Sequence, residues 1–193
     1  HAAWEDAPGV PRALWQHAGA NGLLCCWLPE ALGGPGADLL FGERIDQALQ
    51  RARQDGRRGA LLLVDLDHFK KINDTYGHET GDQVLQQLSV RLKAVMREFD
   101  LLARLGGDEF MLLLQIPHPN AATALTFAER LHQAVAIPYD IRGQQFRLGI
   151  SVGIAIPPGH GRTVGELLRH ADLALYKAKS SGRNCVVQAE DAA

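Results

Sequence analysis

Apolar and polar residues alternate with two different periods along the chain, and each period predicts a type of element. Where apolar residues recur every three to four positions, they mark one face of an amphipathic helix. The stretches with the helical period are residues 39–54, 80–96, 121–136 and 163–182. We expect Thr80 or Asp82 to cap the second of these helices and Gly182 to stop the last.

Apolar runs bounded by turn residues predict the strands. Residues 59–67 form an apolar run that ends in acid, which is typical of a buried strand. Residues 101–116 hold two such runs around Gly-Gly-Asp-Glu and predict a hairpin. Residues 139–156 predict two strands joined by a turn near Arg142–Gly143, and residues 184–187 predict a short final strand.

The order of these elements indicates the fold class. It predicts one α/β (α+β) domain in which helices flank a mixed, largely antiparallel sheet. Residues 1–38 show no sustained period and hold all three tryptophans and four of the nine prolines. We therefore interpret residues 1–29 as a linker or the tail of an upstream module, residues 30–189 as the domain and residues 190–193 as a tail.

Composition and charge exclude several classes of function. A hydrophobic content of 46% and a charged content of 22% are typical of a soluble globular protein. A formal net charge of −2 provides no electrostatic surface for DNA, RNA or an anionic membrane. No apolar stretch approaches the ~18 residues of a membrane span. The three cysteines form neither a disulfide framework nor a metal-binding spacing, so we expect reduced thiols in the cytoplasm.

Acidic residues stand at the ends of two predicted strands. Asp65 and Asp67 end the buried strand, and we expect only one of them to face a given site. An isolated acid at a strand end usually faces solvent, but Asp108 and Glu109 add a second acidic pair at the hairpin tip. Carboxylates from two strand ends can share a hard cation, and Mg²⁺ takes one or two carboxylates together with substrate phosphates.

Two glycines, Gly106 and Gly107, precede the acidic pair and leave the backbone there open to a bulky ligand. With the next three residues they spell GGDEF. The chain also contains "DLDHFKKINDTYGHETGD", "ISVGIA" and "ADLALYKAKSSGRN" in the expected order. From about residue 30 to 187 the chain therefore resembles the GGDEF-domain family, the diguanylate cyclases of bacterial signalling, which join two GTP molecules into cyclic di-GMP. The resemblance implies a fold like that of nucleotide cyclases and polymerase palms.

The resemblance also implies a phosphoryl-transfer site that uses Mg²⁺ or Mn²⁺, two ions per site. Asp108 matches the residue that accepts the proton of the attacking 3′-hydroxyl, and Glu109 and Lys70 complete the implied catalytic set. The implied metal ligands are Asp65, the carbonyl of Leu66, Asp108 and Glu109.

The implied substrate contacts extend along much of the domain. Asn73 and Asp82 match the pair that reads guanine, since an acid accepts from N1–H and N2–H₂ while an amide meets O6 or N3. This pair weighs against a cyclase or polymerase that uses another nucleotide. Without the resemblance, Lys179 and Arg183 would be interpreted as a solvated helix end. The full set is Leu32, Asn73, His78, Asp82, Gly106, Gly107, Lys179 and Arg183, of which the last two hold the triphosphate with Lys70.

A second site is implied by Arg97 and Asp100, which keep the family's Arg-x-x-Asp spacing before the first glycine of the hairpin. This motif is the family's inhibitory site for the product, and Arg104 could add to it. The planar fork of arginine suits guanine and phosphate edges. The alternative is an Arg–Asp ion pair at a helix end.

One stretch departs from the family pattern. Residues 30–38, "EALGGPGAD", keep Leu32 and Gly34, but Ala37 and Asp38 stand where the family has Asn-Arg. A weakly active or inactive domain that binds GTP or cyclic di-GMP is therefore the alternative to an enzyme. For the enzyme, the resemblance implies a homodimer, because one domain holds one GTP, and an upstream sensor domain. Since the chain starts at His1, we expect a fragment of a longer signalling protein, which could be attached to a membrane.

Overall fold

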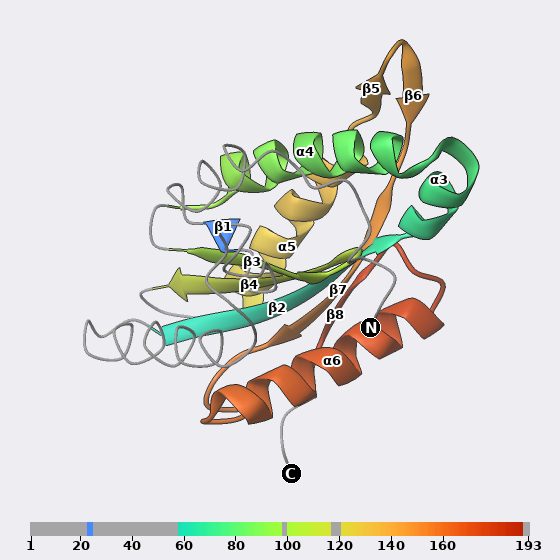
Figure 1. Cartoon of the computed structure of the whole chain (residues 1–193). Helices are drawn as coiled ribbons and strands as arrows, with labels where there is room; N and C mark the ends of the chain where they lie inside the picture. The colour runs from blue at the N-terminus through green and yellow to red at the C-terminus, as the bar shows by residue number, and fades with distance from the viewer. Residues whose placement is uncertain (1–22, 25–57, 98–99, 117–120, 191–193) are drawn as a thin grey trace, which may run out of the picture.

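The computed structural model describes residues 23–24, 58–97, 100–116 and 121–190. Within these ranges, six strands form one sheet and two short strands form a separate hairpin (Figure 1). The strands are β1 (Leu23–Leu24), β2 (Arg58–Asp67), β3 (Leu101–Gly106), β4 (Glu109–Ile116), β5 (Tyr139–Ile141), β6 (Gln144–Phe146), β7 (Gly149–Ala155) and β8 (Val186–Gln188). The helices are α3 (Phe69–Tyr76), α4 (His78–Val95), α5 (Ala121–Ala136) and α6 (Val164–Ser180).

The main sheet has the order β1-β3-β4-β2-β7-β8. Its three inner pairs, β3 with β4, β4 with β2, and β2 with β7, are antiparallel. The outer pairs, β1 with β3 and β7 with β8, are parallel. The predicted mixed, largely antiparallel sheet with flanking helices is therefore confirmed.

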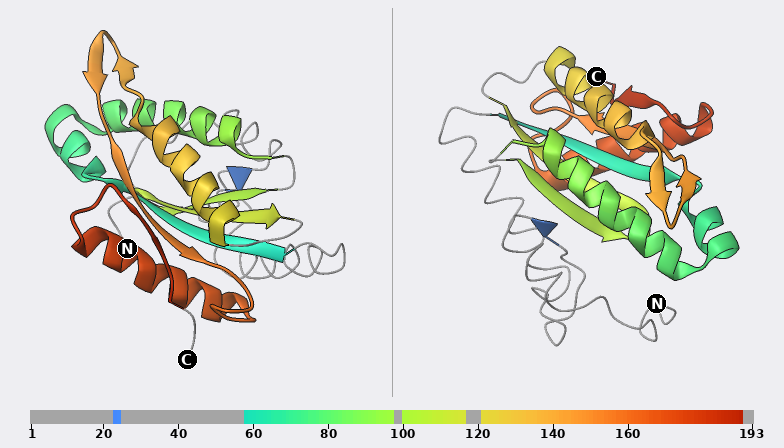
Figure 2. Two further views of the ribbon diagram at one scale, coloured as in Figure 1. Left: turned by 180° about the vertical axis from the view of Figure 1, so that it is seen from behind. Right: turned by 90° about the horizontal axis from the view of Figure 1, so that it is seen from above.

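Helices cover both faces of the sheet, so β2 is buried on both sides. On one face, Leu62 and Val64 of β2 belong to a core cluster shared with α3, α4 and α5. On the other face, Leu61 and Leu63 belong to a second cluster with α6 (Figure 2). A central strand with two buried faces explains the unbroken apolar run from residue 60 to 64.

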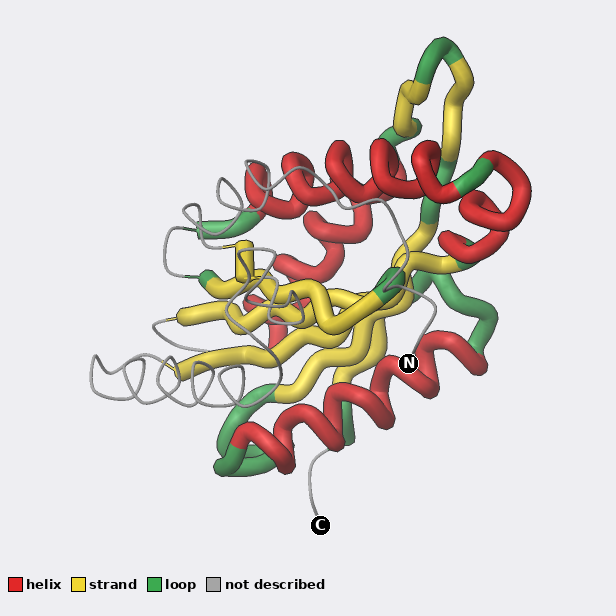
Figure 3. The backbone as a smooth tube through the Cα atoms, in the orientation of Figure 1, coloured by secondary structure: helices red, strands yellow, loops and turns green. Residues whose placement is uncertain are grey.

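The β5–β6 hairpin projects beyond the main sheet at the end where α3 lies (Figure 3). Its turn at Arg142 and Gly143 was predicted. The stretch 139–156, however, forms three strands rather than the predicted two, because the chain leaves the hairpin after Phe146 and enters the main sheet at Gly149.

The start of α4 also differs from the prediction. Neither Thr80 nor Asp82 caps this helix, which begins at His78 after Gly77. Gly77 has φ 83, a left-handed value that ends α3 and turns the chain into α4. The hydroxyl of Thr80 instead donates to the carbonyl oxygen of Tyr76.

The remaining predicted elements lie close to their expected places. Helix α5 has the predicted bounds, and α6 is capped by Thr163 in a capping box with Glu166. Helix α6 ends two residues before Gly182, and β8 begins at Val186 rather than at residue 184. The predicted helix 39–54 and the predicted linker 1–29 lie outside the described residues, apart from the two residues of β1. Among the described residues, no helix is both long and apolar enough to cross a membrane.

Candidate active site

Three carboxylates from two strand ends lie at one end of the sheet. Asp65 of β2 is paired with Glu109 of β4 in the antiparallel register. Asp108 precedes Glu109 in the turn, and its carbonyl oxygen accepts a hydrogen bond of 3.0 Å from the backbone N–H of Leu66. This main-chain bond fixes the hairpin tip to β2, so the acids that the sequence assigned to a shared site do lie together.

Asp65 and Asp67 lie on the same face of β2. Our expectation that only one of them could face a given site was wrong, because the strand continues through Asp67 and side chains two residues apart point to the same side. Both acids face the side of α6, where Asp65 contacts Lys179 and Asp67 contacts the turn after the helix.

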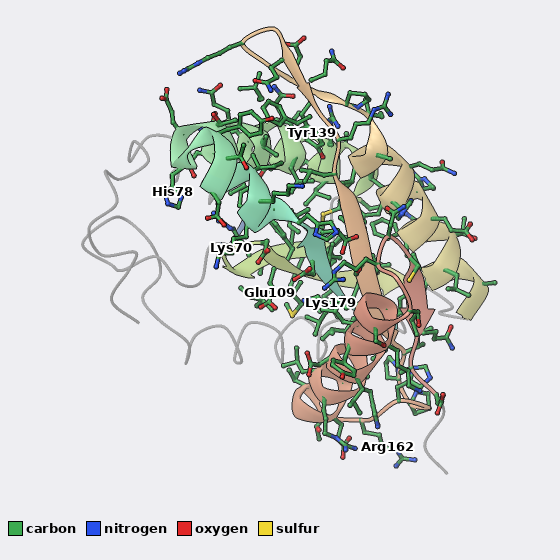
Figure 4. The ribbon with its side chains drawn as sticks, turned by 90° about the vertical axis from the view of Figure 1, so that its right-hand side faces the viewer. Lys70, His78, Glu109, Tyr139, Arg162 and Lys179 are labelled. Carbon is green, nitrogen blue, oxygen red and sulfur yellow. The ribbon has the colours of Figure 1, made fainter. Side chains whose placement is uncertain are left out.

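A lysine already stands between two of the carboxylates. Lys179, in the last turn of α6, places its Nζ 2.6 Å from Oδ2 of Asp65 and 4.0 Å from Oε1 of Glu109. Figure 4 shows Glu109 and Lys179 close together in the same region of the molecule. The sequence proposed Lys179 only as a phosphate contact, because nothing in its spacing reveals a partner more than a hundred residues away.

The pKa values of Asp65 and Glu109 are both raised. Partial burial is the main cause at Asp65, where the charges of Asp108 and Asp67 act in the same direction and Lys179 opposes them. Partial burial also leads at Glu109, which Lys179 again opposes. Burial therefore disfavours the ionised form of both carboxyls, and an added cation would favour it.

The donor set suits a hard divalent cation that is completed by a ligand. Among the described residues, no three Asp, Glu, His or Cys side chains form a closed metal cluster. Mg²⁺, however, binds through one or two carboxylates plus substrate phosphates rather than through an all-protein cage. Asp65, Asp108 and Glu109 could supply those carboxylates, with the backbone carbonyl of Leu66 beside them.

The corner between α3 and α4 brings Asn73 close to the start of α4. Gly81 explains how: a Cβ atom built on Gly81 would lie 1.9 Å from Oδ1 of Asn73. The next residue, Asp82, is exposed in the second turn of α4. Gly81 is a residue that the sequence analysis missed, although its place between two candidate ligands in "YGHETGD" was a signal.

The other predicted substrate contacts lie around this corner and the hairpin tip. Lys70 and His78 are exposed on α3 and α4, and in the view of Figure 4 they form a row with Glu109 and Lys179. A Cβ atom on Gly106 or Gly107 would meet nothing within 4 Å, so the outside of the turn is open. Arg183 is exposed in the turn after α6. Leu32 lies outside the described residues.

The Arg-x-x-Asp motif forms a compact turn beside a cavity. Asp100 is buried, and its two carboxylate oxygens accept hydrogen bonds of 2.9 Å from the backbone N–H groups of Arg97 and Gln115. Arg104 lies elsewhere, since its guanidinium donates to the carbonyl oxygen of Gly107 at the hairpin tip. The cavity has a volume of about 280 Å³ and is lined by Arg97, Asp100, Leu114, Ala122, Thr123, Thr126, Phe127 and Arg130.

Comparison with known proteins identifies a family. A family model described as "Diguanylate cyclase, GGDEF domain" matches residues 39–185. A model of the acyl-CoA dehydrogenase N-terminal domain matches residues 1–59, nearly all of them outside the described ranges. The bifunctional diguanylate cyclase/cyclic di-GMP phosphodiesterase MucR of Pseudomonas aeruginosa is 47% identical over 146 residues, which are 76% of this chain and 21% of that protein. The chain thus spans about a fifth of this relative's length.

Solved structures agree with this match. The GGDEF domain of TpbB from Pseudomonas aeruginosa superposes with a TM-score of 0.73 at 39% identity, covering 78% of this chain and 94% of that one. The GGDEF domain of DgcB from Caulobacter crescentus, in complex with c-di-GMP, gives a TM-score of 0.68 at 31% identity and covers 77% of this chain.

Proposed function

This chain belongs to the diguanylate cyclase GGDEF-domain family, and we propose that its residues 30–189 form a domain that condenses two GTP molecules into cyclic di-GMP. The observation that carries this proposal is the cluster of Asp65, Asp108 and Glu109 at one end of the sheet, with Lys179 between two of them. Three neighbouring carboxylates beside an open turn suit a nucleotide triphosphate that arrives with divalent cations.

We assign the reacting groups as follows. Asp108 takes the proton of the 3′-hydroxyl of one GTP while that hydroxyl oxygen bonds to the α-phosphorus of the other GTP. The bond from that phosphorus to the bridging oxygen breaks, and pyrophosphate leaves. The reciprocal attack by the second 3′-hydroxyl closes the ring and releases a second pyrophosphate. Lys70, Lys179 and Arg183 hold the triphosphate and neutralise the charge that develops on it. Because each domain holds one GTP, two copies must face each other, and the active species is a homodimer.

The residues present fit Mg²⁺ or Mn²⁺, and we propose two ions per site. Asp65, the carbonyl of Leu66, Asp108 and Glu109 would hold them. Bound metal would stabilise the charge on the attacking and bridging oxygens. Leu32, His78, Gly106 and Gly107 are proposed to complete the substrate contacts, and an upstream sensor domain is proposed to control the approach of the two copies.

The test is direct. The protein is incubated with GTP and Mg²⁺, and the nucleotides are identified by mass spectrometry. Cyclic di-GMP and pyrophosphate are the expected products. Ala37 and Asp38, which replace the family's Asn-Arg, favour the second candidate function, a receptor domain. That candidate predicts nucleotide binding by calorimetry without any product.

Nucleotide selectivity should depend on Asp82. A site built to bond the polar edge of guanine rejects an analogue that leaves its groups unpaired, so GTP should bind at least ~100-fold better than ATP. Asp82→Ala should reduce this preference by about tenfold, the value of one hydrogen bond to a charged group. Calorimetry with both nucleotides measures the ratio, and Asp74→Ala, an exposed acid on α3, is the control. Equal affinity of the wild type for ATP and GTP would exclude a guanine pocket.

Product inhibition should depend on Arg97. Its guanidinium is proposed to bind the product, whereas Asp100 accepts two backbone N–H groups and its loss would disturb the fold. Arg97→Ala should therefore weaken cyclic di-GMP binding by roughly 10- to 100-fold and leave the initial rate near normal. Progress curves with added product and direct binding provide the measurement. Arg162→Ala, at the far end of α6 in Figure 4, is the control. Unchanged product affinity in Arg97→Ala would leave this motif as a structural turn.

A further inference from the structure

The turn that follows α6 holds three consecutive residues with left-handed backbone conformations. Gly182 has φ 109, Arg183 has φ 64 and Asn184 has φ 51. Glycine adopts such values freely and asparagine tolerates them, but arginine rarely does. A conformation of this kind persists only where the surrounding structure imposes it. Arg183 is one of the proposed triphosphate ligands, so the groups that impose its conformation bear on the site.

A buried carboxylate holds the backbone of this turn. Oδ2 of Asp67 accepts a hydrogen bond of 2.9 Å from the backbone N–H of Asn184, and its Oδ1 accepts one of 2.7 Å from the hydroxyl of Ser151. Asp67 is only 5% exposed. The N–H of Arg183 donates to the carbonyl oxygen of Ala178, which ties the turn to the end of the helix as well.

The side chain of Asn184 fixes the turn from two further elements. Nε2 of His132, on α5, lies 2.9 Å from Oδ1 of Asn184 and 3.2 Å from its carbonyl oxygen. Gly149 of β7 leaves the space for this amide, because a Cβ atom there would stand 2.5 Å from the same Oδ1. Residues from β2, β7 and α5 therefore converge on Asn184.

We propose that Asp67 and Asn184 are positioning residues that hold Arg183 where it can bind the triphosphate, with His132 as their support. Asp65 pairs with the side chain of Lys179, and Asp67, two residues later on the same face of β2, holds the backbone next to Arg183. The two acids of the "DLD" motif thus have separate tasks. The proposal rests on the proposed function, and neither Asp67 nor Asn184 contacts the nucleotide.

The experiment compares two ligands that share guanine but differ in phosphates. The α,β-methylene analogue of GTP, which cannot release pyrophosphate, is titrated with Mg²⁺ by calorimetry, and guanosine is titrated by ligand-observed NMR. Asn184→Ala and Asp67→Ala should each weaken binding of the analogue by about tenfold, and His132→Ala by about threefold. The affinity for guanosine should stay unchanged. In the Arg183→Ala background, Asn184→Ala should add little, because both changes remove the same contact.

The matched control is Asp140→Ala. Asp140 also accepts a backbone N–H of a left-handed turn, that of Gly143, but in the β5–β6 hairpin. It should alter neither affinity. Two results would overturn the proposal in favour of a general structural role. One is an equal loss of affinity for both ligands in a variant. The other is full additivity of the effects of Asn184→Ala and Arg183→Ala.

Hydrogen exchange gives a reading that needs no nucleotide. In Asp67→Ala no side-chain oxygen is left to accept from the N–H of Asn184, so exchange of the peptide covering residues 181–185 should accelerate about tenfold or more. An unchanged exchange rate contradicts the role of Asp67. The exchange result and the binding result can also differ. If exchange accelerates in the variant but the wild type binds no GTP analogue, the contact between Asp67 and Asn184 is established. The function proposed for the domain, and with it the role of this contact toward the triphosphate, would then be overturned.

Discussion

An Asp108→Ala variant should fold normally and form no measurable cyclic di-GMP. The proposed proton acceptor and metal carboxylate is lost, and metal stabilisation of a phosphoryl-transfer transition state is worth several kcal/mol, or about 10³-fold in rate or more. The fold should persist because the hairpin tip is fixed through the backbone carbonyl of residue 108, which accepts from Leu66 and remains in the variant. Initial rates by mass spectrometry and thermal melting are measured together.

Two further variants sharpen this prediction. Asp108→Glu keeps a carboxylate and should retain part of the activity. Asp140→Ala removes an acid from the turn of the other hairpin, β5–β6, and should change the rate little. Wild-type turnover by a folded Asp108→Ala protein would falsify the catalytic assignment.

The elements that could be predicted are those whose pattern is set by local contacts. The β3–β4 hairpin was predicted because two apolar runs bracket a glycine turn, and α5 and α6 because their apolar faces are long. Helix α3 was missed because it has only eight residues, of which two, Phe69 and Ile72, are buried one turn apart, and so short a pattern is a weak signal. The start of α4 was misplaced because Thr80 and Asp82 are good caps, whereas the chain breaks at Gly77, whose N–H is accepted by the carbonyl of Asn73.

The candidate site was predictable only in part, for a related reason. Asp65 and Asp108 could be grouped because strand ends of one sheet lie together. The contact between Lys179 and Asp65 spans 114 residues and depends on the place of α6 over the sheet, which no local pattern encodes. Asp67 was left out of the predicted site because Asp65 and Asp67 were wrongly expected not to face the same site, although residues two apart on a strand share a face. The turn at Asn184 could not be foreseen, because it is held by residues from three elements distant in sequence.

Lys179 is expected to act on both the nucleotide and the metal, in opposite directions. As a proposed triphosphate ligand, it neutralises charge in the transition state, so Lys179→Met should lower the rate by about 10²–10³-fold. Without nucleotide, however, its ammonium group stands 2.6 Å from Asp65 and 4.0 Å from Glu109, where it competes with any cation for the same carboxylates. Its loss should therefore tighten the binding of metal alone.

The size of this second effect follows from the exposure of the ion pair. The side chain of Lys179 is 30% exposed and that of Asp65 is 12% exposed, so solvent screens the pair only in part, and its contribution is about 1 kcal/mol, or roughly fivefold in metal affinity. Because Lys179 lowers the raised pKa of Asp65, its removal raises that pKa further, and protons then compete more strongly with the metal at low pH. Binding of Mn²⁺ is therefore measured at about pH 8, well above the ordinary pKa of a carboxyl group, to reduce this competition.

The matched control is Lys177→Met. Lys177 lies on the same helix, but its Nζ pairs with the exposed Glu190 and not with the carboxylate cluster. It should change neither the rate nor the Mn²⁺ affinity. A Lys179→Met protein that loses activity without binding Mn²⁺ more tightly would show that the lysine does not compete with the cation. Retained activity would remove Lys179 from the triphosphate site. The expected result is slower turnover together with tighter metal binding. It means that the ammonium group of Lys179 leaves the carboxylates when GTP arrives with its metal, and then binds the phosphates.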